Sequence, residues 1–188
     1  NDTDVDANDN LVISNIISVV GAFTSPMDVN IVDNKLELVI SGSYNSFSEG
    51  QTLPITVVYE MSDGNGGTSQ ATAVITVIGS NDGPIAVVDN VTTNEDANSI
   101  TIDVLANDVD PDNLDTLSIK SLDSVTVANS SAVIELSDFS IVNGEVVFNF
   151  GTKFDSLLLS NTATVKLFYT IEDDHGVTSS AFAEIDIE

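Results

Sequence analysis

The stretch YTIEDDHGVTSSAFAEIDI (169–187) predicts two β-strands joined by a tight turn. Apolar and charged residues alternate in its second half, which is the period of a strand with one face in water. Glu184 and Asp186 have to face the solvent, so the apolar residues beside them face a core. His175-Gly176 supplies the turn signal between the two strands. The stretch therefore indicates an antiparallel hairpin with one buried face.

The same pattern occurs earlier in the chain, so the sequence contains an internal repeat. YEMSDGNGGTSQATAVITV (59–77) matches residues 169–187 at an offset of 110 residues. NDTDVDANDNLVI (1–13) matches NDVDPDNLDTLSI (107–119) at an offset of 106 residues. The difference between the offsets indicates a four-residue insertion in the second copy, most simply in a loop. Two copies of one module of about 105 residues follow.

Short alternating strands recur elsewhere, for example around Ile55-Val57-Tyr59 and Ile100-Ile102-Val104. Asn143-Gly144 marks a turn, and Asp33-Asn34 and Asp89-Asn90 are predicted to be turns as well. No stretch sustains a helical period with caps. The sequence therefore predicts an all-β fold of two tandem Greek-key β-sandwich modules, similar to immunoglobulin or cadherin domains.

The two copies are not equally complete in this sequence. We place module 1 at residues 1–79, a calcium-binding linker at 80–84 and module 2 at 85–188. PIAVVDNV (84–91) and SITIDVLA (99–106) precede the Asp cluster of module 2 and are expected to contain its first two strands. Module 1 begins at its own Asp cluster, so we expect it to lack its first strands.

The charge of the chain is strongly one-sided. Thirty Asp and Glu residues stand against 4 Lys, with no Arg, and the formal net charge is −26. A chain without a basic stripe is a poor partner for nucleic acid and for anionic membrane surfaces. The absence of Cys excludes disulfides and cysteine nucleophiles. The chain also lacks Trp and a G-x-S-x-G motif, and its one His, His175, lies in a predicted surface turn, so we expect no enzyme.

Aspartate dominates the acidic residues, with 21 Asp against 9 Glu. Two runs space them two residues apart, Asp2-Asp4-Asp6 and Asp108-Asp110-Asp112. Short carboxylates at this spacing suit a hard cation that prefers oxygen ligands, and we expect Ca²⁺. An EF-hand is excluded because its sixth loop position is Ala7 or Asn113 rather than glycine. The alternative is that the runs are merely solvated charge.

The predicted topology brings acidic loops together. In a Greek-key sandwich the loop after the second strand and the loop before the last strand lie at the same end. We therefore expect Asp108, Asp110 and Asp112 to lie beside Asp173. Several carboxylates this close repel one another unless a divalent cation neutralises them.

Two stretches resemble a known family. SDGNGGTSQATAVITVIGSNDGP (62–84) resembles the end of a cadherin repeat, and NEDANSITIDVLANDVDPD (94–112) resembles the start of the next one. The order N-D-x-P-x-A, N-E-D and V-L-A-N-D-x-D is similar to the cadherin-like repeats of large bacterial RTX-type and biofilm adhesins. The resemblance covers nearly all of module 2 and the last two-thirds of module 1. It implies that calcium lies at the junction between consecutive modules.

The resemblance also implies the ligands. Carried over to this sequence, the junction ligands are Asn81, Asp82, Asp108, Asp110 and Asp173. Asp112 and Asp115 share the loop of the D-x-D pair, and we add them. The counterparts in module 1 are Asp2, Asp4, Asp6 and Asp63, where we expect an empty or partial site, and Glu49 and Asp155 are the nearest candidates for a further acidic motif of the family. Gly79 and Gly83 stand where the family often has additional ligands.

These observations favour a calcium-dependent structural and adhesive repeat region of an extracellular bacterial surface adhesin, in which calcium makes the junction between adjacent repeats rigid. The alternative is a calcium-dependent recognition module that binds a polysaccharide or a like module on another cell. Carbohydrate platforms usually present exposed aromatic rings. Tyr44 is the single candidate, because Tyr59 and Tyr169 occupy core-facing positions of the repeat.

Overall fold

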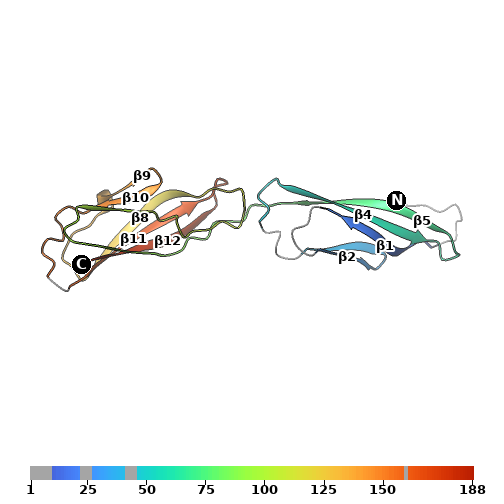
Figure 1. Cartoon of the computed structure of the whole chain (residues 1–188), viewed down its shortest axis with the longest axis horizontal. Helices are drawn as coiled ribbons and strands as arrows, with labels where there is room; N and C mark the ends of the chain where they lie inside the picture. The colour runs from blue at the N-terminus through green and yellow to red at the C-terminus, as the bar shows by residue number, and fades with distance from the viewer. Residues whose placement is uncertain (1–9, 22–26, 41–45, 159–160) are drawn as a thin grey trace. The chain divides into compact units, whose positions relative to one another are not determined.

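The computed structural model describes residues 10–21, 27–40, 46–158 and 161–188. The chain divides into two compact units, unit 1 from Asn1 to Asn81 and unit 2 from Asp82 to Glu188 (Figure 1). In the described ranges the regular structure consists of strands and a short 3₁₀ turn, without an α-helix. The predicted all-β fold is confirmed.

Unit 1 forms two sheets from its described strands. A three-stranded antiparallel sheet has β4 in its centre, and a separate hairpin is formed by β2 and β3. The strands are β1 (Val12–Val20), β2 (Met27–Val32), β3 (Lys35–Ile40), β4 (Thr52–Ser62) and β5 (Thr68–Ile78). The β2–β3 turn is Asp33-Asn34, as predicted, and both residues have positive φ, at 49° and 60°.

Unit 2 is a sandwich of a four-stranded and a three-stranded sheet. The strand orders are β6-β12-β11-β8 and β7-β10-β9, and β6 runs parallel to β12 while the other pairs are antiparallel. The strands are β6 (Asp89–Thr93), β7 (Ser99–Ile102), β8 (Ser118–Ala128), β9 (Phe139–Val142), β10 (Glu145–Asn149), β11 (Ala163–Glu172) and β12 (Thr178–Ile187). A 3₁₀ turn, η2 (Leu136–Asp138), precedes β9.

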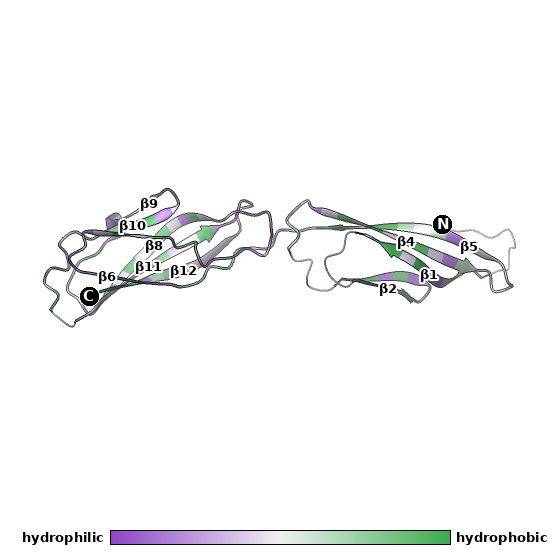
Figure 2. Cartoon of the chain, viewed as in Figure 1, coloured by the Kyte–Doolittle hydropathy of each residue, from purple (hydrophilic) through white to green (hydrophobic). Residues whose placement is uncertain are grey.

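The core of unit 2 lies between its two sheets. Alternate residues of β11 and β12 are buried, among them Leu167, Tyr169 and Ile185. The other sheet contributes Phe139 and Phe148, whose rings stack with centroids 4.2 Å apart. Burying one such side chain contributes about 1.5–3 kcal/mol. Figure 2 shows the apolar residues alternating with polar ones along these strands, which is the pattern that the sequence predicts.

Strand register confirms that the two units are copies of one design. Ile16 on β1 lies opposite Tyr59 on β4, and the equivalent Leu122 on β8 lies opposite Tyr169 on β11. Each of these pairs has a β-bulge on both sides, at equivalent positions in the two units. Bulges are specific features of a strand pair, so their repetition is strong support for a duplicated module.

The predicted insertion can be located from the turns. Asp33-Asn34 and Asn143-Gly144 form equivalent hairpin turns and already stand at the larger offset of 110 residues. Equivalent residues of β1 and β8 are still separated by the smaller offset of 106 residues, as their pairing with β4 and β11 shows. The insertion therefore lies between β8 and β9, in the connection that contains η2.

One turn prediction is wrong. Asp89-Asn90 begins strand β6, which pairs with Ala183 and Glu184 of β12. The Asp89 side chain is 7% exposed and accepts a hydrogen bond from the Tyr169 hydroxyl at 2.8 Å. A buried tertiary contact of this kind overrides the local turn preference of an Asp-Asn pair.

Candidate metal centre

Two loops of unit 2 meet at one end of its sandwich. Residues 103–117 connect β7 to β8, and residues 173–177 connect β11 to β12. Ser118 at the start of β8 lies opposite Glu172 at the end of β11, so both loops leave the sheet at the same edge. Strand pairing thus brings together loops that are far apart in the sequence.

Three aspartates from these loops converge. Asp110, Asp115 and Asp173 each have a carboxylate oxygen, and these oxygens all lie within 4.8 Å of one another. Asp173 is 3% exposed, and the side chain of Asp115 is 2% exposed. Asp112 is 2% exposed and repels Asp110 electrostatically, so a fourth carboxylate borders the same group. Ionised carboxylates this close repel one another strongly unless a proton or a cation neutralises them.

Three buried carboxylate oxygens at this end accept no hydrogen bond. They are Oδ2 of Asp108, Oδ2 of Asp110 and Oδ1 of Asp112. Leaving a buried polar atom unsatisfied costs about 1–3 kcal/mol, and more when it is charged. Oxygen atoms without hydrogen-bond donors are the ligands that a hard cation such as Ca²⁺ takes. The residues present therefore fit a calcium ion.

The opposite oxygens of these carboxylates are held by the main chain. Oδ1 of Asp110 accepts the N–H of Asp112 at 2.9 Å, and Oδ2 of Asp112 accepts the N–H of Asp82 at 2.6 Å. Oδ1 of Asp173 accepts the N–H groups of His175 and Val177 at 3.0 and 2.8 Å. These bonds orient the carboxylates before any ion arrives, which lowers the entropic cost of forming a site.

Electrostatics disfavours the ionised form of two of these groups. Burial raises the pKa of Asp110 most, and the negative charges of Asp115 and Asp112 raise it further, against the hydrogen bond from the Asp112 N–H. Burial also raises the pKa of Asp108, where the N–H of Val87 opposes the shift. A divalent cation would reverse both shifts, since it stabilises the carboxylate.

A second group of possible ligands adjoins the first. Nδ1 of His175 lies 3.0 Å from Oδ2 of Asp115, and Asp174 completes the group. Oδ1 of Asp174 accepts the N–H of Thr116 at 3.1 Å, which ties the two loops together. We did not assign Asp174 or His175 to the site from the sequence. The Asp173-Asp174 doublet before the turn is the signal that could have pointed to them.

The remaining predicted ligands of the junction are placed differently. Asp108 lies in the same loop, but its Oδ1 accepts the N–H of Val87 at 2.7 Å, and it is not in the group of converging oxygens. Asp82 contacts the site through its main-chain N–H, which donates to Oδ2 of Asp112. Asn81 is the last residue of unit 1.

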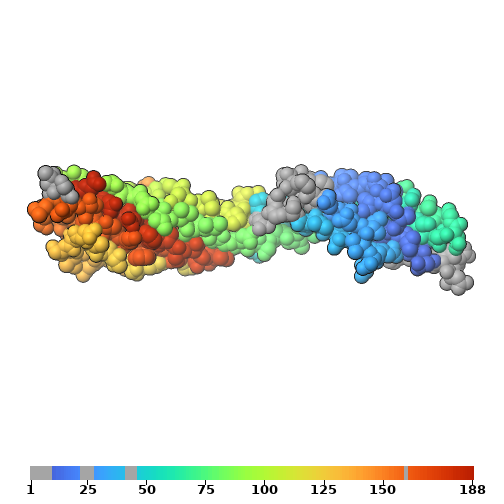
Figure 3. Space-filling view, turned by 90° about the horizontal axis from the view of Figure 1, so that it is seen from below, coloured from blue at the N-terminus to red at the C-terminus, as the bar shows by residue number. Residues whose placement is uncertain are grey.

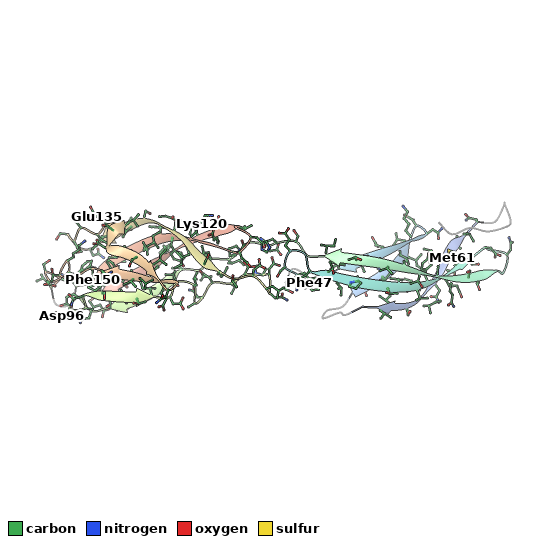
Figure 4. The ribbon with its side chains drawn as sticks, turned by 90° about the horizontal axis from the view of Figure 1, so that it is seen from above. Phe47, Met61, Asp96, Lys120, Glu135 and Phe150 are labelled. Carbon is green, nitrogen blue, oxygen red and sulfur yellow. The ribbon has the colours of Figure 1, made fainter. Side chains whose placement is uncertain are left out.

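In unit 1, Asp63 has the same local geometry as Asp173. Its Oδ1 accepts the N–H groups of Asn65 and Gly67 at 2.7 and 2.9 Å. Glu49 precedes the other end of β4 and is exposed, so it is not brought to Asp63. Figure 4 shows Phe47, which is close to Glu49 in the sequence, and Met61, which is close to Asp63, at opposite ends of unit 1. The predicted ligands Asp2, Asp4 and Asp6, and the candidate Tyr44, lie outside the described residues.

Close packing accounts for Gly79, which precedes the linker, and for Gly83 within it. A Cβ on Gly83 would lie 2.6 Å from Cγ1 of Val177. A Cβ on Gly79 would collide with the carbonyl oxygens of Phe47 and Ser48. A larger ligand-bearing residue would not fit at either position without a shift of its neighbours.

Comparison with known proteins gives a family match and distant structural matches. The family model described as "Bacterial Ig domain" matches residues 81–186, which is more than half of the chain. No curated protein matches the chain. In the described part of the chain, no helix has the length and apolar character needed to cross a membrane.

The solved structures that match include animal protocadherins. Human mucin-like protocadherin EC1-2 has 18% identity and a TM-score of 0.44, covering 91% of this chain and 83% of that one. Mouse protocadherin-24 EC1-3 has 19% identity and a TM-score of 0.44, covering 95% and 58%. Protocadherin gamma C5 EC1-3 has 15% identity and a TM-score of 0.42, covering 97% and 63%. Matches at this level carry no argument about function.

Proposed function

This chain belongs to the bacterial Ig-domain family, and from that premise we propose that it is a calcium-dependent structural and adhesive repeat region of an extracellular bacterial adhesin. The observation that carries the proposal is the set of buried carboxylate oxygens without hydrogen bonds on Asp108, Asp110 and Asp112. In this proposal the chain has no catalytic role.

The residues that would hold calcium are Asp110, Asp112, Asp115 and Asp173, supported by the proximity of the oxygens of three of them. When bound, the ion supplies positive charge and further coordination positions for water. The β7–β8 loop and the β11–β12 loop meet at this point, so a bound ion would link two segments that are distant in the sequence. Calcium sites outside cells commonly have dissociation constants of about 10⁻⁴–10⁻³ M, which suits an extracellular structural role.

Calcium would also act on the segment that enters unit 2. Asp112 holds the N–H of Asp82 at 2.6 Å, so fixing the carboxylate of Asp112 fixes the end of the linker. We therefore include in the proposal that calcium restricts the linker and stiffens the array of repeats. Small-angle scattering in calcium and in chelator checks this part: a narrower, more extended ensemble is expected in calcium. Identical scattering profiles under conditions where calcium binds would refute the stiffening of the array but not the calcium site.

The binding site itself is tested with a matched pair of variants. Asp110→Asn removes the negative charge of a proposed ligand, whereas Asp155→Asn removes the same charge from an exposed position before β11, away from the loops of the site. At a calcium concentration of about 100 times the dissociation constant, binding adds about 2.7 kcal/mol to the free energy of unfolding. We expect this increment in the wild type and in Asp155→Asn, and its loss in Asp110→Asn. Melting curves that are the same in calcium and in chelator would refute the metal site.

A further inference from the structure

The outward face of the four-stranded sheet of unit 2 carries two aromatic rings. Phe168 on β11 and Phe182 on β12 lie directly opposite each other, and their ring centroids are 5.6 Å apart. Both alternate with buried residues of their strands, so they project away from the core, and Phe168 is 36% exposed. Figure 3 shows the red β12 at the surface beside the green segment that contains β6. The core of the sandwich therefore does not account for this ring pair.

Polar side chains border the ring pair on both sides along the strands. On one side the Thr170 hydroxyl lies 2.9 Å from that of Ser180 and donates to Oδ2 of Asp123 at 2.7 Å. On the other side Nζ of Lys166 lies 2.6 Å from Oε2 of Glu184. Hydroxyl, carboxylate and ammonium groups thus surround a small apolar centre.

Lys166 also holds one of the rings in place. Its Nζ lies over the ring of Phe182, 4.6 Å from the centroid, where the negative face of the ring attracts the ammonium group. Glu184 fixes the same ammonium group, and Phe182 in turn contacts Phe168. The ring pair is therefore ordered before any ligand arrives, which lowers the entropic cost of binding.

Unit 1 shows that the repeat does not require these rings. At the offset of 110 residues Phe168 and Phe182 correspond to Val58 on β4 and Thr72 on β5. Val58 and Thr72 also lie opposite each other, so the strand register is the same in the two units. The ring pair is therefore a property of unit 2 and not of the duplicated framework.

A sugar ring has the chemistry that this face matches. A hexose presents an apolar face of C–H groups, whose partial positive charge is attracted to the negative face of an aromatic ring. Its rim consists of hydroxyls, which both donate and accept hydrogen bonds. The carboxylates of Asp123 and Glu184 accept such bonds, Lys166 donates them, and the Thr170 hydroxyl does both.

Charge and size disfavour other partners. The net charge of −26 and the carboxylates on this face repel nucleic acid and anionic polysaccharides. A protein interface buries about 800 Å² on each partner around an apolar centre. Among the described residues of β6, β8, β11 and β12, Phe168 and Phe182 are the only large apolar side chains that face outward. Two rings do not supply such a centre, but they suffice for one sugar ring.

We propose that this face of unit 2 binds a neutral polysaccharide, with a hexose ring stacked on Phe168 and its hydroxyls bonded to the polar side chains around the ring pair. The proposal rests on the adhesive part of the proposed function and supplies its ligand class. Phe168 and Phe182 lie in the middle of β11 and β12, whereas the proposed calcium ligands lie in the loops at one end of the sheet. Sugar binding and calcium binding can therefore be tested separately.

Affinity electrophoresis of the full chain through gels that contain a polysaccharide tests the proposal. The neutral probes are dextran, laminarin and galactomannan, and alginate is the anionic probe. We expect at least one neutral probe to retard the chain, equally in calcium and in chelator, and alginate to leave it unretarded. Phe168→Val should lower the affinity for that neutral probe about tenfold, because the stacking is lost. No retardation by any neutral probe, or retardation that Phe168→Val leaves unchanged, overturns the proposal.

Matched variants separate the ring pair from the fold. Phe168→Val and Phe182→Thr copy Val58 and Thr72 of unit 1, which occupy the same register, and both should weaken binding. Phe168→Tyr keeps the ring and should keep the affinity. Val74→Ala removes a 65% exposed apolar side chain from the equivalent face of unit 1 and should bind as the wild type does.

Asp110→Asn separates this proposal from the calcium site. The variant should lose the rise in melting temperature that calcium causes and should keep the retardation by polysaccharide. Loss of retardation in Asp110→Asn or in chelator would mean that the ion holds the sugar, which overturns the ring-pair site and leaves the calcium site. Retardation of a wild type that calcium does not stabilise would refute the calcium site alone.

Discussion

Unit 1 and unit 2 share strand order, register and bulges, yet they bury the same positions to different extents. Tyr169 is 0% exposed in unit 2, whereas its counterpart Tyr59 is only partly buried in unit 1. The buried core of unit 1 consists of Leu53, Ile55 and Val57 among the described residues, while that of unit 2 draws on both sheets.

The difference goes with strand pairing, because β12 pairs with β6 whereas β5 pairs only with β4 among the described residues. β6 and β7 add few residues, but each adds an edge strand to one of the two sheets, and Asp89 of β6 accepts a hydrogen bond from the Tyr169 hydroxyl. Because hydrophobic stabilisation follows the apolar area removed from water, the same strand sequence stabilises unit 2 more than unit 1. Two matched pairs of substitutions and a pH series test this comparison.

The largest contrast is expected for an isoleucine pair. Ile185→Ala empties a fully buried position on β12, and Ile75→Ala changes its partly buried counterpart on β5. We expect a loss of about 3–4 kcal/mol in unit 2 and about half of that in unit 1, because an exposed cavity costs less than a closed one. Urea unfolding followed by hydrogen exchange in each unit gives both values. Equal losses would mean that the two cores are equally closed.

A smaller contrast is expected for the tyrosine pair. Tyr169→Phe removes the hydroxyl that donates to Oδ2 of Asp89 and leaves that carboxylate buried with one donor fewer. Burial already raises the pKa of Asp89, so we expect a loss of about 1–3 kcal/mol. Tyr59→Phe should cost less, because water can reach a partly exposed position. The same unfolding measurement gives both losses of stability. A larger loss at Tyr59 than at Tyr169 would contradict the proposed difference between the two environments.

The smallest contrast concerns pH in the absence of calcium. Burial raises the pKa of Asp108 and Asp110 above 3.8, so these two groups bind more protons in native unit 2 than in its unfolded chain, and their contribution to stability falls as pH rises through these pKa values. In unit 1 the hydrogen bond from Asn65 lowers the pKa of Asp63, whose contribution is lost as pH falls below 3.8. Melting curves in chelator between pH 3 and pH 7 should therefore show opposite trends in the two units.

Calcium provides the control for this pH series. A bound cation favours the ionised carboxylates, so the stabilisation of unit 2 by calcium should grow as pH rises. A stabilisation by calcium that stays constant between pH 4 and pH 7 would argue against Asp108 and Asp110 as groups whose ionisation is coupled to calcium binding. Asp63 gives a reference within the same molecule, since its pKa is lowered by main-chain donors.

Much of the fold could be predicted because its signals are local. Alternation places Ile185 and Ile187 in the core, and Asp33-Asn34 and Asn143-Gly144 form the turns that their residue types favour. The failure at Asp89-Asn90 has a tertiary cause, because Asp89 is held by a tyrosine 80 residues away. No local pattern reports such a contact.

The sequence alone determined the duplicated module, its offsets and the identity of the acidic loops, because each of these depends on residue order along one strand or turn. Only the tertiary structure decided which carboxylates face each other. Asp115 meets Asp173 and His175 through the pairing of β8 with β11, whereas Asp108 turns to the N–H of Val87. The physical reason is that side-chain direction in a loop follows the main-chain hydrogen bonds that the loop makes, and these bonds join segments that lie far apart in the sequence.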